Sequence, residues 1–164
     1  MEPTFHFPET LTKAGRYEAF LQQFAPLISG EHALMGVLAN TAAALHEAFG
    51  FFWVGFYWVH DEEWLTLGPF QGSVACYRIR RGRGVCGTAW AERRTLVVPD
   101  VDRFPGHIAC SSLSRSEIVV PLTDASGRVH GVLDIDSDRL DSFDETDRRY
   151  LEKVCRFVSE AVFL

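Results

Sequence analysis

The sequence predicts a single α+β domain, in which a central antiparallel sheet packs against two N-terminal helices and one C-terminal helix. Apolar residues recur at three- and four-residue steps near both ends of the chain, which is typical of amphipathic helices. The middle of the chain is rich in β-branched and aromatic residues and is interrupted by glycine-containing turns, which is typical of strands. A length of 164 residues with 47% hydrophobic residues fits one continuous core.

The N-terminal segment, about residues 1–49, is expected to hold two helices. Residues 16–28 have apolar side chains at helical spacing, although Pro26 weakens the prediction for the last turn. Residues 31–49 predict a longer helix, and Gly50 follows it where a left-handed C-terminal cap is expected.

The next segment, about residues 50–137, is expected to hold the sheet and its functional loops. Residues 51–59 (FFWVGFYWV) are apolar throughout and therefore predict a central strand. After an acidic turn at 61–63, two further strands are predicted over 64–70 and 75–79.

A short helix over 85–94 and a short strand over 95–100 follow in the prediction. Residues 99–116 lack periodicity and are rich in Pro, Gly and Ser, and a loop of this length inside a compact domain is usually functional. Strands over 116–122 and 128–137 are joined by a turn with the sequence DASG, which indicates a hairpin.

The last predicted helix covers about residues 143–163 and is capped by Ser142 or Asp144. Cys155 lies beside the apolar stripe of this helix. Because free cysteine is often buried as a small apolar residue, we expect Cys155 to serve only in packing.

The charge balance argues against nucleic acid or a membrane as a partner. Lys and Arg number 16 against 22 Asp and Glu, which gives a formal charge of −6, whereas both partners need basic surfaces. The basic cluster Arg78, Arg80, Arg81 and Arg83 is interpreted as a solvated strand end and turn. No apolar stretch approaches the roughly 20 residues of a membrane span, and the first residues lack a signal-peptide pattern. We therefore expect a cytoplasmic protein.

The other three cysteines, Cys76, Cys86 and Cys110, are candidates for redox chemistry, since static disulfides are rare in a reducing compartment. Cys86 lies at the start of a predicted helix, where the helix dipole stabilises a thiolate. Composition alone supports equally well three unrelated core residues. Zinc bound by these cysteines and His107 is a further alternative, but the sequence has no CxxC or HxxxH pair.

Three acids are candidates for proton transfer. Asp134 and Asp136 are two residues apart in a predicted strand and so share one face, and Glu117 opens the neighbouring strand. If buried, such carboxyl groups have raised pKa values, which suits a general acid. Strand position alone slightly favours the alternative that they are solvated acids at a strand end.

Aromatic side chains are concentrated in the first predicted hairpin. Most of them are expected in the core, and a subset could line a small apolar pocket that the sequence does not delimit. These residues are Phe52, Trp53, Phe56, Tyr57, Trp58 and Trp64.

Six motifs together resemble the free methionine-(R)-sulfoxide reductase family, whose members have a GAF fold. They are FFWVGFYWV, LGPFQG, ACYRIRRGRGVCGTA, DVDRFPGHIACSS, SEIVVPL and GVLDIDS. The resemblance is dense over about residues 50–137 and looser in the flanking helices. Strands similar to GVLDIDS occur across GAF domains, whereas three cysteines in their three motif contexts are specific to the reductases.

The resemblance implies a dimeric enzyme, one GAF domain over residues 1–164, that reduces the free amino acid. By resemblance, Cys110 in GHIAC is the attacking cysteine, Cys76 in VACYRI the resolving cysteine and Cys86 in GVCGTA a second or auxiliary thiol. The sequence leaves open whether Cys76 or Cys86 is the main resolving thiol. The acids that bind and protonate the sulfoxide match Glu117, Asp134 and Asp136. A dithiol protein such as thioredoxin would restore the thiols, and no metal, flavin or nucleotide is required. Two rival interpretations are a GAF module that senses a small ligand and a redox switch that signals without turnover.

Overall fold

The structure is a computed structural model that describes residues 4–163. Its strands are β1 (Trp53–Val59), β2 (Trp64–Gln71), β3 (Arg78–Arg80), β4 (Leu96–Val98), β5 (Ser116–Thr123) and β6 (Val129–Ser137). They form one sheet in the order β3-β2-β1-β6-β5-β4, and all neighbours are antiparallel. The predicted antiparallel sheet is therefore confirmed, with the apolar strand β1 between two partners.

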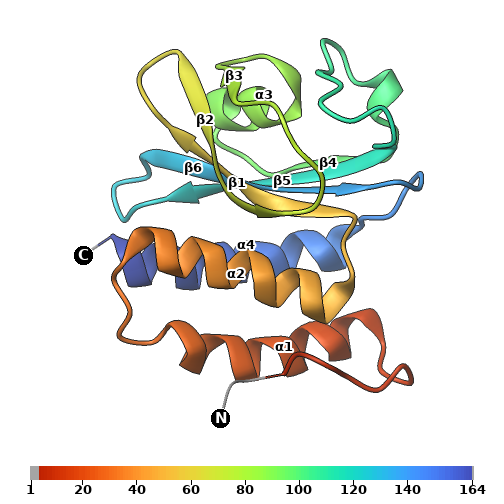
Figure 1. The fold of residues 1–164 in the computed structure, drawn as a ribbon, viewed down its shortest axis with the longest axis vertical. Helices are drawn as coiled ribbons and strands as arrows, with labels where there is room; N and C mark the ends of the chain where they lie inside the picture. Colours follow the sequence, from red (N-terminus) through yellow and green to blue (C-terminus); the bar gives the residue numbers. More distant parts are fainter. Residues whose placement is uncertain (1–3, 164) are drawn as a thin grey trace.

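Helices cover both faces of this sheet (Figure 1). They are α1 (Lys13–Ile28), α2 (Leu34–Phe49), α3 (Gly84–Glu92) and α4 (Glu145–Val162), with a 3-10 turn at Val101–Arg103. On one face α2 and α4 lie against the sheet, as predicted, whereas α1, also expected on the sheet, packs outside these two helices. The helix α3 and two loops lie on the opposite face. Within residues 4–163, no helix has the length and apolar character needed to cross a bilayer.

Several predicted boundaries differ from the structure, among them the start of the first helix, which is Lys13 rather than residue 16. The second helix begins at Leu34 rather than at residue 31, although Gly50 ends it in a left-handed conformation (φ 63°) as predicted. The strand predicted over 75–79 is reduced to β3, because residues 72–77 leave the sheet as a loop toward the α3 face. We call this segment, residues 72–77, the Cys76 loop.

The larger hydrophobic core lies between the sheet and the helices α1, α2 and α4. Phe20 of α1, Leu151 of α4 and Phe56 of β1 are fully buried there. Burial of a side chain of this size contributes about 1.5–3 kcal/mol relative to leaving it exposed. Because side chains alternate along a strand, Trp53 and Tyr57 of β1 face the other side.

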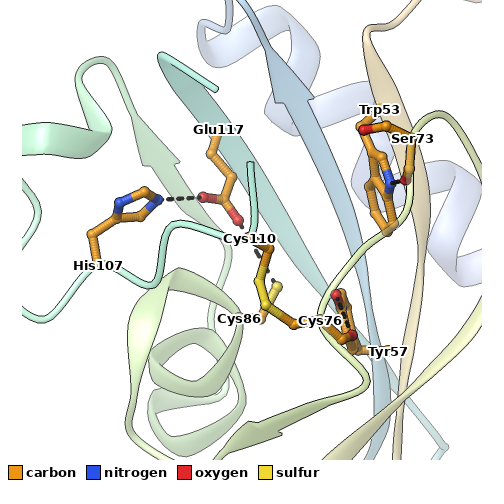
Figure 2. The surroundings of a disulfide bond; sticks show 8 residues. All are labelled: Trp53, Tyr57, Ser73, Cys76, Cys86, His107, Cys110 and Glu117. Carbon is orange, nitrogen blue, oxygen red and sulfur yellow. Dashed lines mark hydrogen bonds and ion pairs between the residues drawn. A yellow bond between two sulfur atoms is a disulfide. The ribbon is translucent and has the colours of Figure 1, made fainter. Parts of the chain in front are cut away.

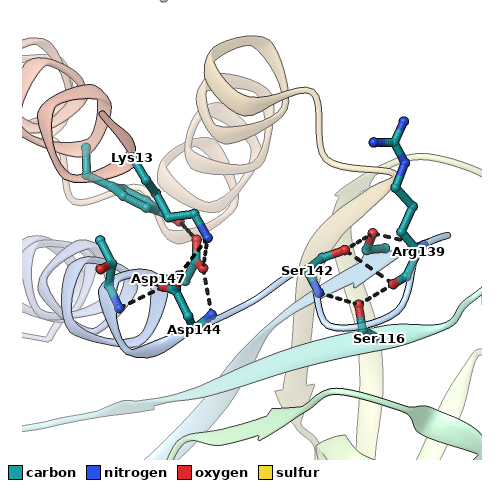
Figure 3. A network of polar contacts seen from close by, with 9 residues as sticks. Lys13, Ser116, Arg139, Ser142, Asp144 and Asp147 are labelled. Carbon is teal, nitrogen blue, oxygen red and sulfur yellow. Dashed lines mark hydrogen bonds and ion pairs between the residues drawn. The ribbon is translucent and has the colours of Figure 1, made fainter. Parts of the chain in front are cut away.

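A polar network fixes the start of α4 (Figure 3). Asp144 is the N-cap, and the carboxylate of Asp147 accepts a hydrogen bond from the backbone N–H of Asp144. The Nζ atom of Lys13 contacts Oδ2 of Asp147 at 2.7 Å and so ties α1 to α4. Ser142, the alternative cap in the prediction, instead donates its backbone N–H to Oγ of Ser116 at 3.3 Å. These contacts hold both the helix and the first residue of β5 in place.

Candidate active site

A small cavity of about 50 Å³ lies on the α3 face of the sheet. Its wall includes aromatic, acidic and sulfur-containing side chains, among them Trp53, Tyr57, Cys86, Cys110, Glu117, Asp134 and Asp136. Five of the six predicted site residues therefore line one cavity, and the sixth, Cys76, is bonded to Cys110. Five separate segments of the chain supply the named residues: β1, α3, the loop before β5, β5 and β6.

The pairing of β5 with β6 places the three acids on one face of the sheet. Glu117 is directly opposite Asp136, and Asp134 lies two residues along the same strand as Asp136. Glu117 and Asp134 are only 6% and 5% exposed, and Asp136 is half-buried. The shared face is thus confirmed, and the interpretation of solvated strand-end acids is wrong.

Burial dominates the electrostatics of these acids. It raises the pKa of all three carboxyl groups, and the proximity of the Asp134 carboxyl group raises the pKa of Glu117 and Asp136 further. Ser114 donates a hydrogen bond of 2.8 Å to Asp136, which opposes part of that shift. Oδ1 of Asp134 is buried without a hydrogen-bond partner among residues 4–163. An unsatisfied buried group costs about 1–3 kcal/mol, so a bound polar ligand would relieve this cost.

Cys86 enters the cavity from the first turn of α3. This turn packs closely on the end of β3 because the next residue is Gly87, where any Cβ would collide with the carbonyl oxygen of Arg80. The Sγ atom of Cys86 donates to Oε1 of Glu117 at 3.9 Å. Burial and the carboxyl groups of Asp134 and Glu117 raise the pKa of this thiol. The predicted Cys86 thiolate is therefore wrong, because desolvation and like charge outweigh the helix dipole.

A disulfide joins Cys76 to Cys110 across 34 residues of sequence, with a Cα–Cα distance of 5.4 Å (Figure 2). Two aromatic side chains of β1 hold the Cys76 loop beneath it. Trp53 Nε1 donates to the carbonyl oxygen of Ser73, and Tyr57 Oη donates to that of Cys76, both at 3.0 Å. The central strand thereby positions one half of the redox pair, and Cys110 carries the other half into the cavity.

His107 is a site residue that the sequence analysis considered only as a zinc ligand. Its Nε2 atom points at Oε2 of Glu117 from 4.0 Å (Figure 2), and its side chain is only 14% exposed. Burial lowers its pKa, which favours the neutral imidazole beside the acid. The sequence feature that could have identified His107 as a site residue is its position three residues before Cys110 in the aperiodic loop.

The disulfide also determines which residues are available to bind a metal ion. The alternative zinc site needed Cys76 and Cys110 as thiolates, whereas their sulfur atoms are bonded to each other. The residues that could hold a metal ion are instead Cys86, Glu117 and Asp134, whose ligand atoms lie within 4.8 Å of one another. The fourth cysteine, Cys155, lies in the helix-side core, as predicted.

Comparison with known proteins places this cavity in a family. The GAF domain family model matches residues 33–162. The chain is 57% identical over 147 residues to GAF domain-containing protein A of Dictyostelium discoideum, covering 90% of this chain and 92% of that protein. It is 43% identical over 145 residues to the free methionine-R-sulfoxide reductase of Escherichia coli, covering 88% of this chain and 87% of that enzyme. The chain belongs to the free methionine-R-sulfoxide reductase family.

A solved member of this reductase family has the same fold. The structure of the Neisseria meningitidis free methionine-R-sulfoxide reductase in complex with its substrate superposes with a TM-score of 0.91 at 53% identity. The match covers 96% of this chain and 93% of that one. The family resemblance of the six sequence motifs and the predicted GAF-type α+β fold are both confirmed.

Proposed function

We propose that this reductase converts free L-methionine-(R)-sulfoxide to L-methionine, with Cys110 as the attacking thiol and Cys76 as the resolving thiol. The observation that carries this assignment is their disulfide at the wall of a cavity that also buries carboxyl groups. Family membership supports the substrate, since the relatives of Escherichia coli and Neisseria meningitidis are named for this reduction.

The acids supply the proton that the reaction needs. A sulfoxide sulfur is a poor electrophile until its oxygen is protonated or strongly hydrogen-bonded. Glu117 and Asp136 have raised pKa values, so they hold a proton at higher pH than exposed carboxyl groups do. We assign proton donation to this pair, with neutral His107 orienting Glu117 from the loop side.

The thiols complete the redox balance. Sγ of Cys110 attacks the substrate sulfur and forms an S–S bond, the sulfoxide oxygen moves to Sγ, and the substrate's S–O bond and the S–S bond break. Methionine leaves with its sulfur reduced, and Cys110 is left as a sulfenic acid. The thiol of Cys76 then attacks that sulfenic acid, forms the disulfide and releases water. Cys86 keeps its proton throughout, because burial and its acidic neighbours disfavour the thiolate.

One feature favours a free amino acid over a peptide. A free amino acid carries an ammonium group that an internal residue lacks, and the unpartnered Oδ1 of Asp134 suits such a donor. Trp53 and Tyr57 offer apolar ring surface for the side-chain methyl group.

A thioredoxin-type dithiol protein is the proposed reductant, since each turnover ends with a disulfide that must be reopened. This chemistry suits the cytoplasm, where such dithiols are kept reduced. We also assign a homodimer, which light scattering of the purified protein tests directly.

The deciding experiment is turnover of free L-methionine-(R)-sulfoxide with dithiothreitol, using wild type, Cys110→Ser and Cys155→Ser. We expect turnover of the (R) epimer alone, its loss in Cys110→Ser and its retention in Cys155→Ser. Absence of turnover by folded, reduced wild-type protein would contradict the proposal and favour a ligand-sensing module. Disulfide formation by peroxide without turnover would favour the redox switch.

A further inference from the structure

Exposed apolar side chains are concentrated around the disulfide. Residues 4–163 contain seven large hydrophobic residues with exposed side chains, and four of them lie on the two loops that the disulfide joins. Val74 and Tyr77, at the Cys76 loop, are 88% and 83% exposed. Ile108 and Leu113, on the loop before β5, are 37% and 63% exposed. We call these four residues the apolar rim.

The apolar rim differs from ordinary surface hydrophobics because its members gather at a reactive group. Single exposed apolar residues are common and need no explanation, whereas a contiguous patch beside a site marks an interaction surface. Met35 on α2 and Leu140 after β6 are the isolated kind, at 61% and 57% exposure. They serve below as matched controls.

Positive charge borders the rim. Arg78 follows Tyr77 directly in the sequence. Arg83 precedes Gly84, and Gly84 lies close to Ile108, because a Cβ added at this glycine would be 3.2 Å from Cγ1 of Ile108. Neither arginine forms an ion pair within the described residues 4–163, and residues 72–83 contain no acid. The segment 72–83 therefore carries a net positive charge, whereas the whole chain has a formal charge of −6. A partner with acidic residues around an apolar centre is complementary to it.

We propose that the apolar rim docks a dithiol protein whose reactive cysteine is exposed within an apolar surface bordered by acidic residues. This inference rests on the proposed function, in which the disulfide must be reduced once per turnover. Each rim residue lies within three residues of Cys76 or Cys110 in the sequence, so docking and chemistry would occupy neighbouring parts of the surface.

The geometry also assigns the sulfur that is attacked. Cys76 and Cys110 are both half-buried, but Cys110 lines the substrate cavity and Cys76 does not, so attack at Cys76 keeps the partner out of the cavity. The partner's thiolate attacks Sγ of Cys76, the Cys76–Cys110 bond breaks, and Cys110 leaves as a thiolate inside the cavity. The partner's second thiol then breaks the mixed disulfide. In total two electrons and two protons pass to this chain, and the partner becomes a disulfide.

The test compares a protein reductant with a small one. Reduced thioredoxin is the protein probe and dithiothreitol the small probe, and the variant is Tyr77→Ser/Leu113→Ser, since neither residue lines the cavity. We expect kcat/KM for thioredoxin to fall roughly 10- to 100-fold, with dithiothreitol-supported turnover unchanged. The control Met35→Ser/Leu140→Ser should match wild type with both reductants. Unchanged thioredoxin kinetics, or an equal loss with both reductants, would overturn the docking role.

A second measurement keeps this inference separate from the proposed function. Oxidised protein is mixed with thioredoxin in the absence of any sulfoxide, and disulfide reduction is followed directly, so the result does not depend on turnover. Arg78→Glu should slow this reduction, and raising the ionic strength should slow it for wild type. If the rim variant is reduced at the wild-type rate but changes from dimer to monomer, the rim is an interface between copies of this chain and the proposal fails.

Trapping identifies the attacked sulfur. A thioredoxin variant that lacks its second cysteine stops at the mixed disulfide, which peptide mass spectrometry can map. We expect the thioredoxin to be linked to the peptide that contains Cys76. A link to Cys110 would contradict the assigned direction of attack.

Discussion

The face of the sheet that α2 and α4 cover, here called the helix-covered face, differs from the α3 face in how its buried polar groups are paired. On the helix side, Thr41 donates to a backbone carbonyl at 2.7 Å and Tyr17 donates to Asp147 at 2.7 Å, and the exception among residues 4–163 is the buried Nε of Arg16, which has no partner. On the α3 side, Oδ1 of Asp134 has no partner among the described residues, and three carboxyl groups crowd one cavity. The first arrangement stabilises the fold without a ligand, whereas the second keeps a stability cost that substrate binding can relieve.

The two buried free cysteines also differ in their surroundings between the two faces. Cys86 and Cys155 are both 3% exposed. Cys155 packs among apolar side chains of the helix-side core, whereas Cys86 contacts Glu117 in the cavity wall. The same residue type at the same exposure therefore meets apolar side chains on one face and a carboxyl group on the other.

The largest expected effect separates activity from stability on the α3 face. Glu117→Gln removes the proton donor, so kcat/KM for the sulfoxide should fall roughly 10²- to 10⁴-fold. The free energy of unfolding at pH 7 should not decrease, because a buried ionisable group is replaced by a neutral one. Steady-state kinetics and urea denaturation of the same preparation measure both. Activity within a few-fold of wild type would remove Glu117 from the mechanism.

The converse change is expected on the helix-covered face. Leu151→Ala leaves a cavity in the larger core and should lower the free energy of unfolding by about 2–5 kcal/mol. Because Leu151 lies in the core on the other side of the sheet, kcat of the folded fraction should equal that of wild type. A large loss of kcat in folded protein would show that the two faces are not independent.

The raised pKa values predict how stability depends on pH. Carboxyl groups that keep their protons in the folded protein lose them at lower pH in the unfolded chain, so stability should decrease as pH rises above the ordinary carboxyl range. Glu117→Gln/Asp136→Asn should flatten this decrease by about 1–3 kcal/mol between pH 5 and pH 8. Urea denaturation at both pH values measures it, with the exposed Asp138→Asn as control. An unchanged slope in the double variant would mean that these carboxyl groups do not retain protons.

The smallest expected effects concern the two free cysteines. Cys155→Ser buries a hydroxyl group in an apolar core and should lower the free energy of unfolding by about 1–2 kcal/mol, with normal turnover.

Cys86→Ser should still form the Cys76–Cys110 disulfide after one equivalent of sulfoxide. Thiol titration of the denatured, oxidised wild type should find two thiols, and peptide mapping should assign them to Cys86 and Cys155. A Cys86 disulfide in wild type would make Cys86 the resolving thiol instead.

Local pattern predicted most of the fold and part of the site. The apolar run 51–59 became the central strand β1, and the two-residue spacing of Asp134 and Asp136 placed both at one cavity. The boundary error at 75–79 has a tertiary cause, because Trp53 and Tyr57 hold that segment off the sheet as the Cys76 loop. The residue pattern of the loop does not reveal these contacts, because both hydrogen-bond donors lie on β1.

The sequence by itself determined the order of helices and strands, the family motifs and the set of residues with redox and acid chemistry, because periodicity and residue type are local properties. Only the tertiary structure decided which cysteines are bonded, which aromatic rings line the cavity and where protons are held. Cys76 and Cys110 meet across 34 residues of sequence through the packing of two loops. The pKa of Cys86 is raised because the fold excludes water from it and surrounds it with carboxyl groups, and desolvation is a property of the assembled interior.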